Sequence, residues 1–130
     1  MLFNKYWLLF GCCLEFLLPA PLWAQQNLTQ SQTAFFEKNI RPAFVKYCYE
    51  CHSESSGKTR GGLLLDTSEG LLLGGDSGPV LVPKSLHESV LWSAINWEDY
   101  QMPPKNKLPA AVIANFKKWI EMGAPDPRLR

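Results

Sequence analysis

The feature that most constrains this chain is the run Cys48-Tyr49-Glu50-Cys51-His52, in which two cysteines three positions apart are followed directly by a histidine. Residues i and i+3 share one face of a helical turn, so both thiols can add to the two vinyl groups of one porphyrin. The imidazole of His52 is then placed under the ring, where it can bind the iron. We therefore predict that one haem c is attached covalently through Cys48 and Cys51, with His52 as an axial ligand.

Residues 1–24 have the organisation of an export signal. Lys5 gives a positively charged start, residues 6–18 are mostly apolar, and prolines interrupt the run before Ala24. A small residue such as alanine suits the last position before a cleavage site. We expect cleavage near Ala24/Gln25 and a mature protein that is periplasmic or secreted.

A retained membrane anchor is the competing interpretation of this segment. The apolar run is short and contains Glu15, and a carboxylate is costly in the core of a membrane span. Lipid attachment at Cys12 is also disfavoured, because bulky Phe10 precedes it and the apolar run continues past it. Cleavage removes Cys12 and Cys13, so the mature chain keeps only the two cysteines of the motif.

Three other kinds of site fit the motif less well than haem attachment. A thioredoxin-like pair would need a β-α-β context, and no alternation of strands and helices surrounds these cysteines. A zinc site would need two more ligands, and the mature chain offers only His87 beyond the run. A structural disulfide would leave His52 without a role.

The iron of such a haem needs a second axial ligand or an open position, and three residues are candidates. Met102 precedes two prolines, which exclude helix and hold the thioether on a stiff, extended loop. Met122 ends a periodic helical segment, where methionine more often fills a core. His87 follows the predicted helix cap Ser85, at a position where a solvated histidine is expected. We predict Met102 as the ligand, with His87 or an open site as the alternatives.

Several further motifs accompany the run at residues 48–52. In chain order they are Phe36-Glu37-Lys38-Asn39-Ile40-Arg41-Pro42, Gly61-Gly62-Leu63-Leu64-Leu65-Asp66, Gly74-Gly75-Asp76-Ser77-Gly78-Pro79, Glu98-Asp99, Met102-Pro103-Pro104, Trp119-Ile120 and Gly123-Ala124-Pro125. In this combination, residues 36–127 resemble the planctomycete-type cytochrome c domain, a branch of the monohaem cytochrome c superfamily. Leu64 departs from the family pattern, which often has a basic residue there that can pair with a haem propionate.

The resemblance implies an all-α fold, a compact cytochrome c-like helical domain around one covalently bound haem with a long glycine-rich loop region. It also implies His52 and Met102 as the axial ligands and a role in electron transfer. In cytochromes c the first and last helices cross beside the haem. The expected contact is therefore between Phe36 or Ile40 and Phe116 or Trp119.

Apolar residues at helical spacing predict three helices, in agreement with this fold. The first covers residues 33–47, and Pro42 should kink or split it. The second covers residues 85–96 and is capped by Ser85 and Glu88. The last has Pro109 at its first position and Gly123 just past its end. Leucine triplets at residues 63–65 and 71–73 punctuate the glycine-rich stretch. They either line the haem or form a satellite patch of core.

These expectations divide the chain into four parts. They are a signal peptide over residues 1–24, a flexible N-terminal tail over residues 25–32, the cytochrome c domain over residues 33–127 and a C-terminal tail over residues 128–130. The charge is nearly balanced, with 13 Lys and Arg against 12 Asp and Glu. This balance excludes nucleic acid as the main partner, since binding a polyanion needs a clear basic excess.

Six further side chains are candidate contacts of the haem propionates or of an acidic partner. Solvated surface charge is the better explanation for each charged one, and a place in the pocket wall explains the two aromatic ones equally well. The six are Lys58, Arg60, Lys105, Lys107, Trp97 and Tyr100. The segment at residues 75–79 resembles the nucleophile segment of trypsin-like proteases. The mature chain is too short for the two barrels of such an enzyme, so we interpret the segment as a glycine-rich turn near the haem.

We predict an electron carrier rather than an enzyme, because two bonded axial positions leave the iron without a substrate site. The expected partners are redox proteins, whose identity the sequence does not specify, and a membrane-associated complex is a further candidate. We expect a monomer. Two alternatives stay open: a ligand sensor or peroxidase-like site with an open sixth position, and a docking module in which the haem is structural.

Overall fold

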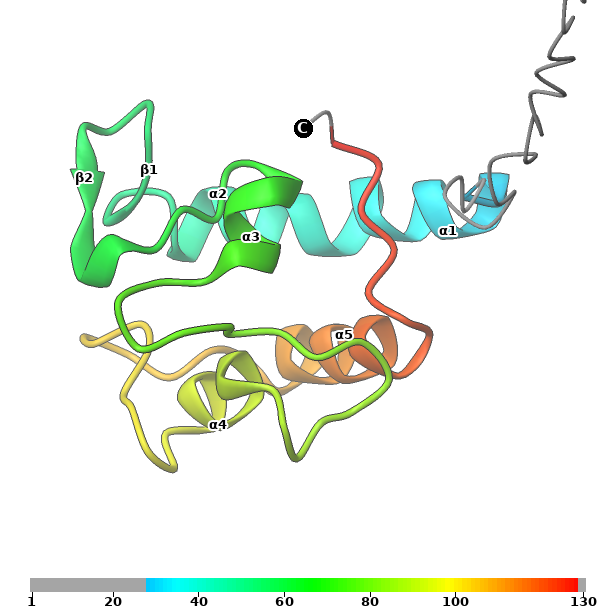
Figure 1. Cartoon of the computed structure of the whole chain (residues 1–130). Helices are drawn as coiled ribbons and strands as arrows, with labels where there is room; N and C mark the ends of the chain where they lie inside the picture. The colour runs from blue at the N-terminus through cyan, green and yellow to red at the C-terminus, as the bar shows by residue number, and fades with distance from the viewer. Residues whose placement is uncertain (1–27, 129–130) are drawn as a thin grey trace, which may run out of the picture.

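A long helical arm forms the N-terminal part of the structure, a computed structural model that describes residues 28–128 (Figure 1). Three segments follow one another in this arm: α1 (Gln30–Phe35), the π-helical turn η2 (Phe36–Ile40) and α2 (Arg41–Tyr47). Thr29 caps α1, because its hydroxyl accepts a hydrogen bond from the backbone N–H of Gln32. The arm therefore begins within the stretch that we expected to be a flexible tail. The predicted signal peptide lies outside the described residues.

The π-helical turn lies where Pro42 was expected to kink or split the first helix. Proline has no N–H to donate, and its ring crowds the carbonyl four residues earlier, that of Lys38. The hydrogen bonding widens over η2, where the N–H of Arg41 reaches the carbonyl of Phe36. Pro42 thus changes the type of helix at this point, and α2 continues the arm.

A short antiparallel ribbon follows the cysteine motif. In it β1 (His52–Ser53) pairs with β2 (Lys58–Thr59), with His52 opposite Thr59. Gly57 adopts a left-handed φ of +64° in the connecting turn, which helps the chain to reverse. The protein is therefore helix-rich but not purely helical, which corrects the expected all-α fold class.

Two short helical segments lie in the glycine-rich stretch, for which the sequence showed no sustained period. They are η3 (Arg60–Gly62) and α3 (Ser68–Leu73). Thr67 caps α3 through its hydroxyl. The second leucine triplet belongs to α3 and is divided, since Leu71 is buried in the core and Leu73 is exposed.

The helix α4 (Val90–Asn96) is shorter than predicted, because it does not begin at Ser85. The hydroxyl of Ser89 explains this late start: it accepts a hydrogen bond from the N–H of Val82 at 3.0 Å and lies 2.6 Å from the carbonyl of Ser85. These bonds hold the preceding residues in a turn. The predicted capping contact of Glu88 with Ser85 exists, at 3.4 Å, but it does not start the helix.

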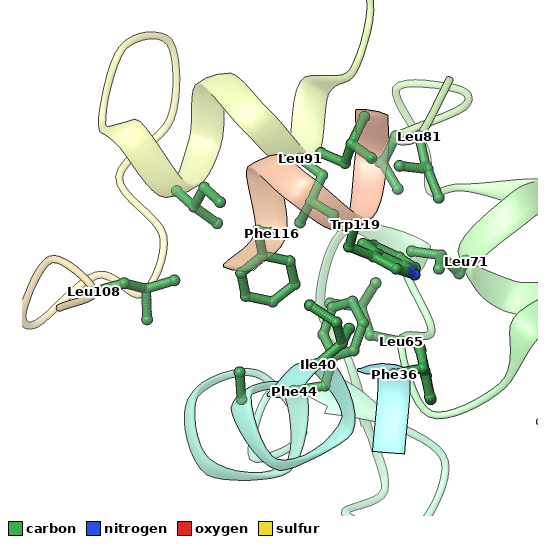
Figure 2. Close-up of a cluster of buried hydrophobic side chains, with 14 residues drawn as sticks. Phe36, Ile40, Phe44, Leu65, Leu71, Leu81, Leu91, Leu108, Phe116 and Trp119 are labelled. Carbon is green, nitrogen blue, oxygen red and sulfur yellow. The ribbon is translucent and has the colours of Figure 1, made fainter. Parts of the chain in front are cut away.

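The last helix, α5 (Ala110–Glu121), packs against the helical arm, and a cluster of aromatic rings lies between them (Figure 2). The ring centroids of Phe36 and Trp119 are 6.0 Å apart, and those of Phe44 and Phe116 are 5.2 Å apart in an edge-to-face arrangement. These rings are all buried. The expected contact between the first and last helices is confirmed.

The chain beyond α5 returns to the core. Gly123 adopts a φ of +99° just past the end of the helix, as predicted, and the indole N–H of Trp119 donates to the carbonyl of Pro125 at 2.9 Å. Arg128 is then only 8% exposed, although we assigned it to a C-terminal tail. Within residues 28–128, no helix is both long enough and apolar enough to cross a membrane.

Candidate functional site

The cysteine motif forms a tight turn directly after α2. The carbonyl of Cys48 accepts hydrogen bonds from the N–H groups of Cys51 at 3.1 Å and of His52 at 3.0 Å. The segments beyond it secure the other side of the turn: Arg60 donates its N–H to the carbonyl of Cys51, and Leu65 donates its N–H to the carbonyl of His52 at 2.8 Å. The backbone of the motif is therefore held both by the motif itself and by residues that follow it in the chain.

All four predicted site residues line one cavity of ≈ 260 Å³. They are Cys48, Cys51, His52 and Met102. Most of the remaining wall is apolar, and it comes from the end of α2, the glycine-rich stretch, α4 and the loop before α5. Its aliphatic members include Leu63, Leu65, Val80, Val90, Leu91 and Ile95. The structure thus brings the motif and the methionine together around an apolar space.

The three candidates for the second axial ligand are placed differently. Met102 lines the cavity, and its N–H donates to the carbonyl of Ala94 in α4 at 3.1 Å. Met122 lies instead beside a separate polar hollow at the end of α5. His87 belongs to the turn before α4 and does not line the cavity with the motif. Of the candidates, Met102 is the one that shares a cavity with His52.

Burial shifts the pKa values of two of the predicted site residues, Cys48 and His52. Burial, followed by the neighbouring Cys51, raises the pKa of Cys48 to about 12, so its sulfur is a thiol at neutral pH. Both cysteines are free thiols in the structure. Burial lowers the pKa of His52, an effect that the backbone groups of Leu63 and Arg60 partly oppose. The neutral imidazole is the form that binds metal ions.

These residues fit a covalently bound haem. Two free thiols, a neutral imidazole and a thioether meet at an apolar cavity, which is the donor set of a haem held by His and Met. The Nδ1 atom of His52 is buried and makes no hydrogen bond with any residue between 28 and 128. A metal-bound histidine usually donates this N–H, so the backbone groups of Leu63 and Arg60 beside the ring are its candidate acceptors.

The other polar residues suggested by the sequence are divided by the structure. Arg60 and Tyr100 line the cavity, whereas the three lysines at 58, 105 and 107 do not. The indole nitrogen of Trp97 is buried without a hydrogen-bond partner in the described part of the chain, and Trp97 does not line the cavity. Ser77 lines the cavity from the glycine-rich turn, in agreement with the interpretation of that segment as a turn near the site.

Two contributions to the site were not apparent from the sequence. Ala94 lines the cavity and also binds the N–H of Met102, and its only signal is a small residue within the apolar stripe of α4. Tyr47, the last residue of α2, also lines the cavity, although its spacing predicted only a helix face toward the core. Both contributions depend on which residues of α2 and α4 the fold turns toward the cavity.

A comparison with known families supports this reading of the site. A family model described as Planctomycete cytochrome C matches residues 48–106, somewhat less than half of the chain. The match confirms the resemblance to planctomycete-type cytochrome c. No curated protein and no solved structure gives a significant match to the chain.

The cytochrome c match begins at Cys48 and ends just after the Met102 loop, so it spans all four candidate site residues. The helical arm and α5, which pack together through the aromatic cluster, lie outside it. Cytochromes c are haem proteins that generally carry electrons and do not act as enzymes. The match therefore supports haem binding and electron transfer for this chain.

Proposed function

We propose that this protein is an exported monohaem cytochrome c that carries single electrons between redox proteins. The observation that carries the proposal is that Cys48, Cys51, His52 and Met102, which come from two distant segments, line one apolar cavity. When bound, haem c supplies one iron atom that accepts and releases one electron. Cys48 and Cys51 would hold the group through thioether bonds, and His52 and Met102 would bind its iron.

The surroundings of these residues suit an electron carrier. The cavity wall is mostly apolar. Such an environment disfavours the extra charge of ferric iron, which raises the reduction potential. Cys48 and Cys51 are partly exposed. A porphyrin attached to them would keep an edge near the surface, which brings it close to a docked partner.

The place of action and the partners form part of the same proposal. Cytochrome c domains are typically extracellular or periplasmic, and an export signal at residues 1–24 would deliver this chain there. Covalent attachment prevents loss of the haem outside the cytoplasm. Arg60 at the cavity wall would pair with a propionate, in a chain that has Leu64 where a basic residue is common in relatives. We expect a monomer that docks transiently to redox proteins.

The test is to produce the protein with a c-type maturation system and to record its optical spectrum. We expect covalently bound haem and a low-spin spectrum with the red sulfur–iron charge-transfer band. Met102→Ala should abolish that band, because the thioether is its source. Met122→Ala is the matched control and should keep the band, since Met122 lies away from the cavity. A protein without covalently bound haem would contradict the proposal as a whole.

The same spectrum separates the electron carrier from a second candidate, a site whose sixth position is open. Prompt binding of carbon monoxide by the ferrous wild-type protein, without the charge-transfer band, would support a ligand sensor or a peroxidase-like site. A ferrous spectrum that carbon monoxide leaves unchanged would support the electron carrier.

A further inference from the structure

A buried ion pair near the C-terminus is not used by the proposed function. The side chains of Arg128 and Asp126 are only 5% and 9% exposed, and they form a salt bridge. The Nε atom of Arg128 donates to Asp126 Oδ1 at 2.9 Å, and both terminal nitrogens donate further bonds. Burial lowers the pKa of Arg128, but Asp126 and Tyr49 outweigh this effect and raise the pKa above its ordinary value. The guanidinium group is therefore charged.

The guanidinium group reaches from the end of the chain to the cysteine motif. Its Nη1 atom donates a hydrogen bond to the hydroxyl of Tyr49 at 2.8 Å, and Tyr49 lies between the two cysteines. The same nitrogen donates to the carbonyl of Leu65. The N–H of Leu65 is in turn bonded to the carbonyl of His52 at 2.8 Å. One side chain thus binds both the turn that carries the cysteines and the segment that holds His52.

Aromatic rings of the core complete the environment of this group. The guanidinium carbon of Arg128 lies 5.1 Å from the ring centroid of Phe36 and 5.4 Å from that of Phe44. The ring of Phe44 also stacks on Tyr49, with centroids 6.5 Å apart and an interplanar angle of 11°. The contacts therefore link the helical arm, the motif and the C-terminal segment at one point.

We propose that Arg128 is a positioning residue that fixes the cysteine turn and the backbone of His52 for haem attachment and iron ligation. The inference rests on the proposed function, because it assumes that His52 binds the iron. A guanidinium group donates from several N–H groups in a rigid planar fork, so its bonds to Asp126, Tyr49 and Leu65 restrain one another in direction. A lysine at this position has no such fork.

A comparison with a second arginine distinguishes the positioning role of Arg128 from a general contribution to core stability. Another arginine, Arg41, lies over the same ring of Phe36 at 6.0 Å, but its side chain is 43% exposed and pairs with Glu37 in its own helix. Within residues 28–128, Arg41 forms no hydrogen bond or ion pair with the motif. Arg41 is therefore a matched control for an arginine on this ring that does not reach the motif.

The test compares four variants of the mature holoprotein by amide hydrogen exchange. Arg128→Met removes the bonds to both Tyr49 and Leu65, and Tyr49→Phe removes only the first of them while it keeps the ring. Arg41→Met is the arginine control, and Ile120→Val, at a fully buried position away from the cavity, lowers stability in general. We expect Arg128→Met to accelerate exchange at residues 48–53 and 63–66 about tenfold, since bonds to charged groups are among the stronger ones. Tyr49→Phe should accelerate exchange at residues 48–53 alone. Neither control should accelerate exchange at residues 48–53 and 63–66 more than in the rest of the chain.

A second readout responds to the orientation of His52 and not to stability. The shifts of the haem methyl groups in the NMR spectrum of the ferric protein depend on how the axial imidazole is turned. We expect Arg128→Met to change their pattern and Ile120→Val to leave it unchanged. If Arg128→Met matches Ile120→Val in both measurements, the inference is overturned, because the residue then only stabilises the fold.

The outcomes for this inference and for the proposed function can be told apart. A wild-type chain without covalently bound haem would contradict the proposed function, while the exchange rates at residues 48–53 and 63–66 would still show whether Arg128 holds the turn. If Arg128→Met does not fold, Tyr49→Phe carries the test, since it leaves the ion pair with Asp126 in place. No change of exchange at residues 48–53 in Tyr49→Phe would then overturn the inference.

Discussion

At the scale of single residues, the candidate site depends on backbone groups as much as on side chains. The carbonyl of Cys48 accepts two N–H groups of its own motif, and the carbonyl of His52 accepts that of Leu65. Such bonds are worth about 0.5–1.5 kcal/mol each, and together they leave the turn little freedom. The thiols and the imidazole are thus directed toward the cavity by the backbone that carries them.

The glycine-rich turn shows a second constraint at this scale. Gly75 lines the cavity and lies so close to the carbonyl of Gly61 that a Cβ atom would overlap it. The N–H of Asp76 donates to the same carbonyl at 2.7 Å, which fixes the two stretches against each other. A side chain at this point would force the wall of the cavity apart.

We therefore expect Gly75→Ala to lower the free energy of unfolding by about 1–3 kcal/mol, the usual cost of overpacking. Gly57→Ala is the control, because nothing lies within 4 Å of the added methyl group and only its left-handed φ of +64° opposes alanine. Denaturant unfolding of both holoproteins measures the difference. A smaller loss for Gly75→Ala than for Gly57→Ala would contradict the close approach of the two backbones.

At the scale of elements, long-range hydrogen bonds decide where helices begin and end. Ser89 is 2% exposed, and its hydroxyl forms hydrogen bonds with the N–H of Val82 and the carbonyl of Ser85. These bonds stand where a longer helix would have its first turn. Without the Ser89 hydroxyl, the N–H of Val82 would lose its acceptor. The start of α4 is therefore set by a turn in front of it and not by its own sequence.

Ser89→Ala should lower the free energy of unfolding by about 1–3 kcal/mol, because it leaves the N–H of Val82 without its acceptor. Ser93→Ala is the matched control: its hydroxyl bonds only the carbonyl of Val90 in its own helix, at 3.1 Å. For this control we expect a loss below about 1 kcal/mol. Thermal unfolding of the two variants gives the comparison, and equal losses would argue against a special role for the turn.

The existence of most elements could be read from local patterns, but some of their boundaries could not. The end of α5 at Gly123 follows from a glycine that alone tolerates the left-handed conformation there. Pro42 indicates roughly where the first helix is interrupted. Whether the helix kinks there or widens into the π-helical turn depends on packing against α5. The ribbon β1–β2 is too short to leave an alternating apolar pattern.

At the scale of the whole molecule, two kinds of core support each other. The aromatic cluster packs the helical arm against α5 and takes no part in the cavity. The rings of Phe36, Phe116 and Trp119 do not line the cavity. The cavity end has walls from the glycine-rich stretch and the Met102 loop, which contain few long elements. That end needs an apolar object to pack against, whereas the other end packs on itself.

We expect the haem-free double variant Cys48→Ser/Cys51→Ser to melt about 10–20 °C lower than the holoprotein, which corresponds to about 2–3 kcal/mol for a domain of this size. Its loss of order should be concentrated in residues 60–108, which include most of the cavity wall, while the contact between the arm and α5 persists. Circular dichroism and hydrogen exchange measure the two effects. Equal melting temperatures for the two forms would show that the cavity needs no occupant.

What the sequence determined by itself is the chemistry of attachment. Two cysteines and a histidine at fixed spacing predict it from neighbouring residues alone, without reference to the rest of the fold. The family match at residues 48–106 includes this motif. The helix periods and the terminating glycine are local for the same reason.

Only the tertiary structure decided which distant residues meet. Met102 shares a cavity with His52 because α4 holds its loop, and Arg128 reaches Tyr49 because the chain turns back after α5. An arginine near the end of a sequence looks like part of a solvated tail. Its burial is stabilised by Asp126, Tyr49, Leu65 and two aromatic rings, and contacts between residues so far apart leave no pattern in the local sequence.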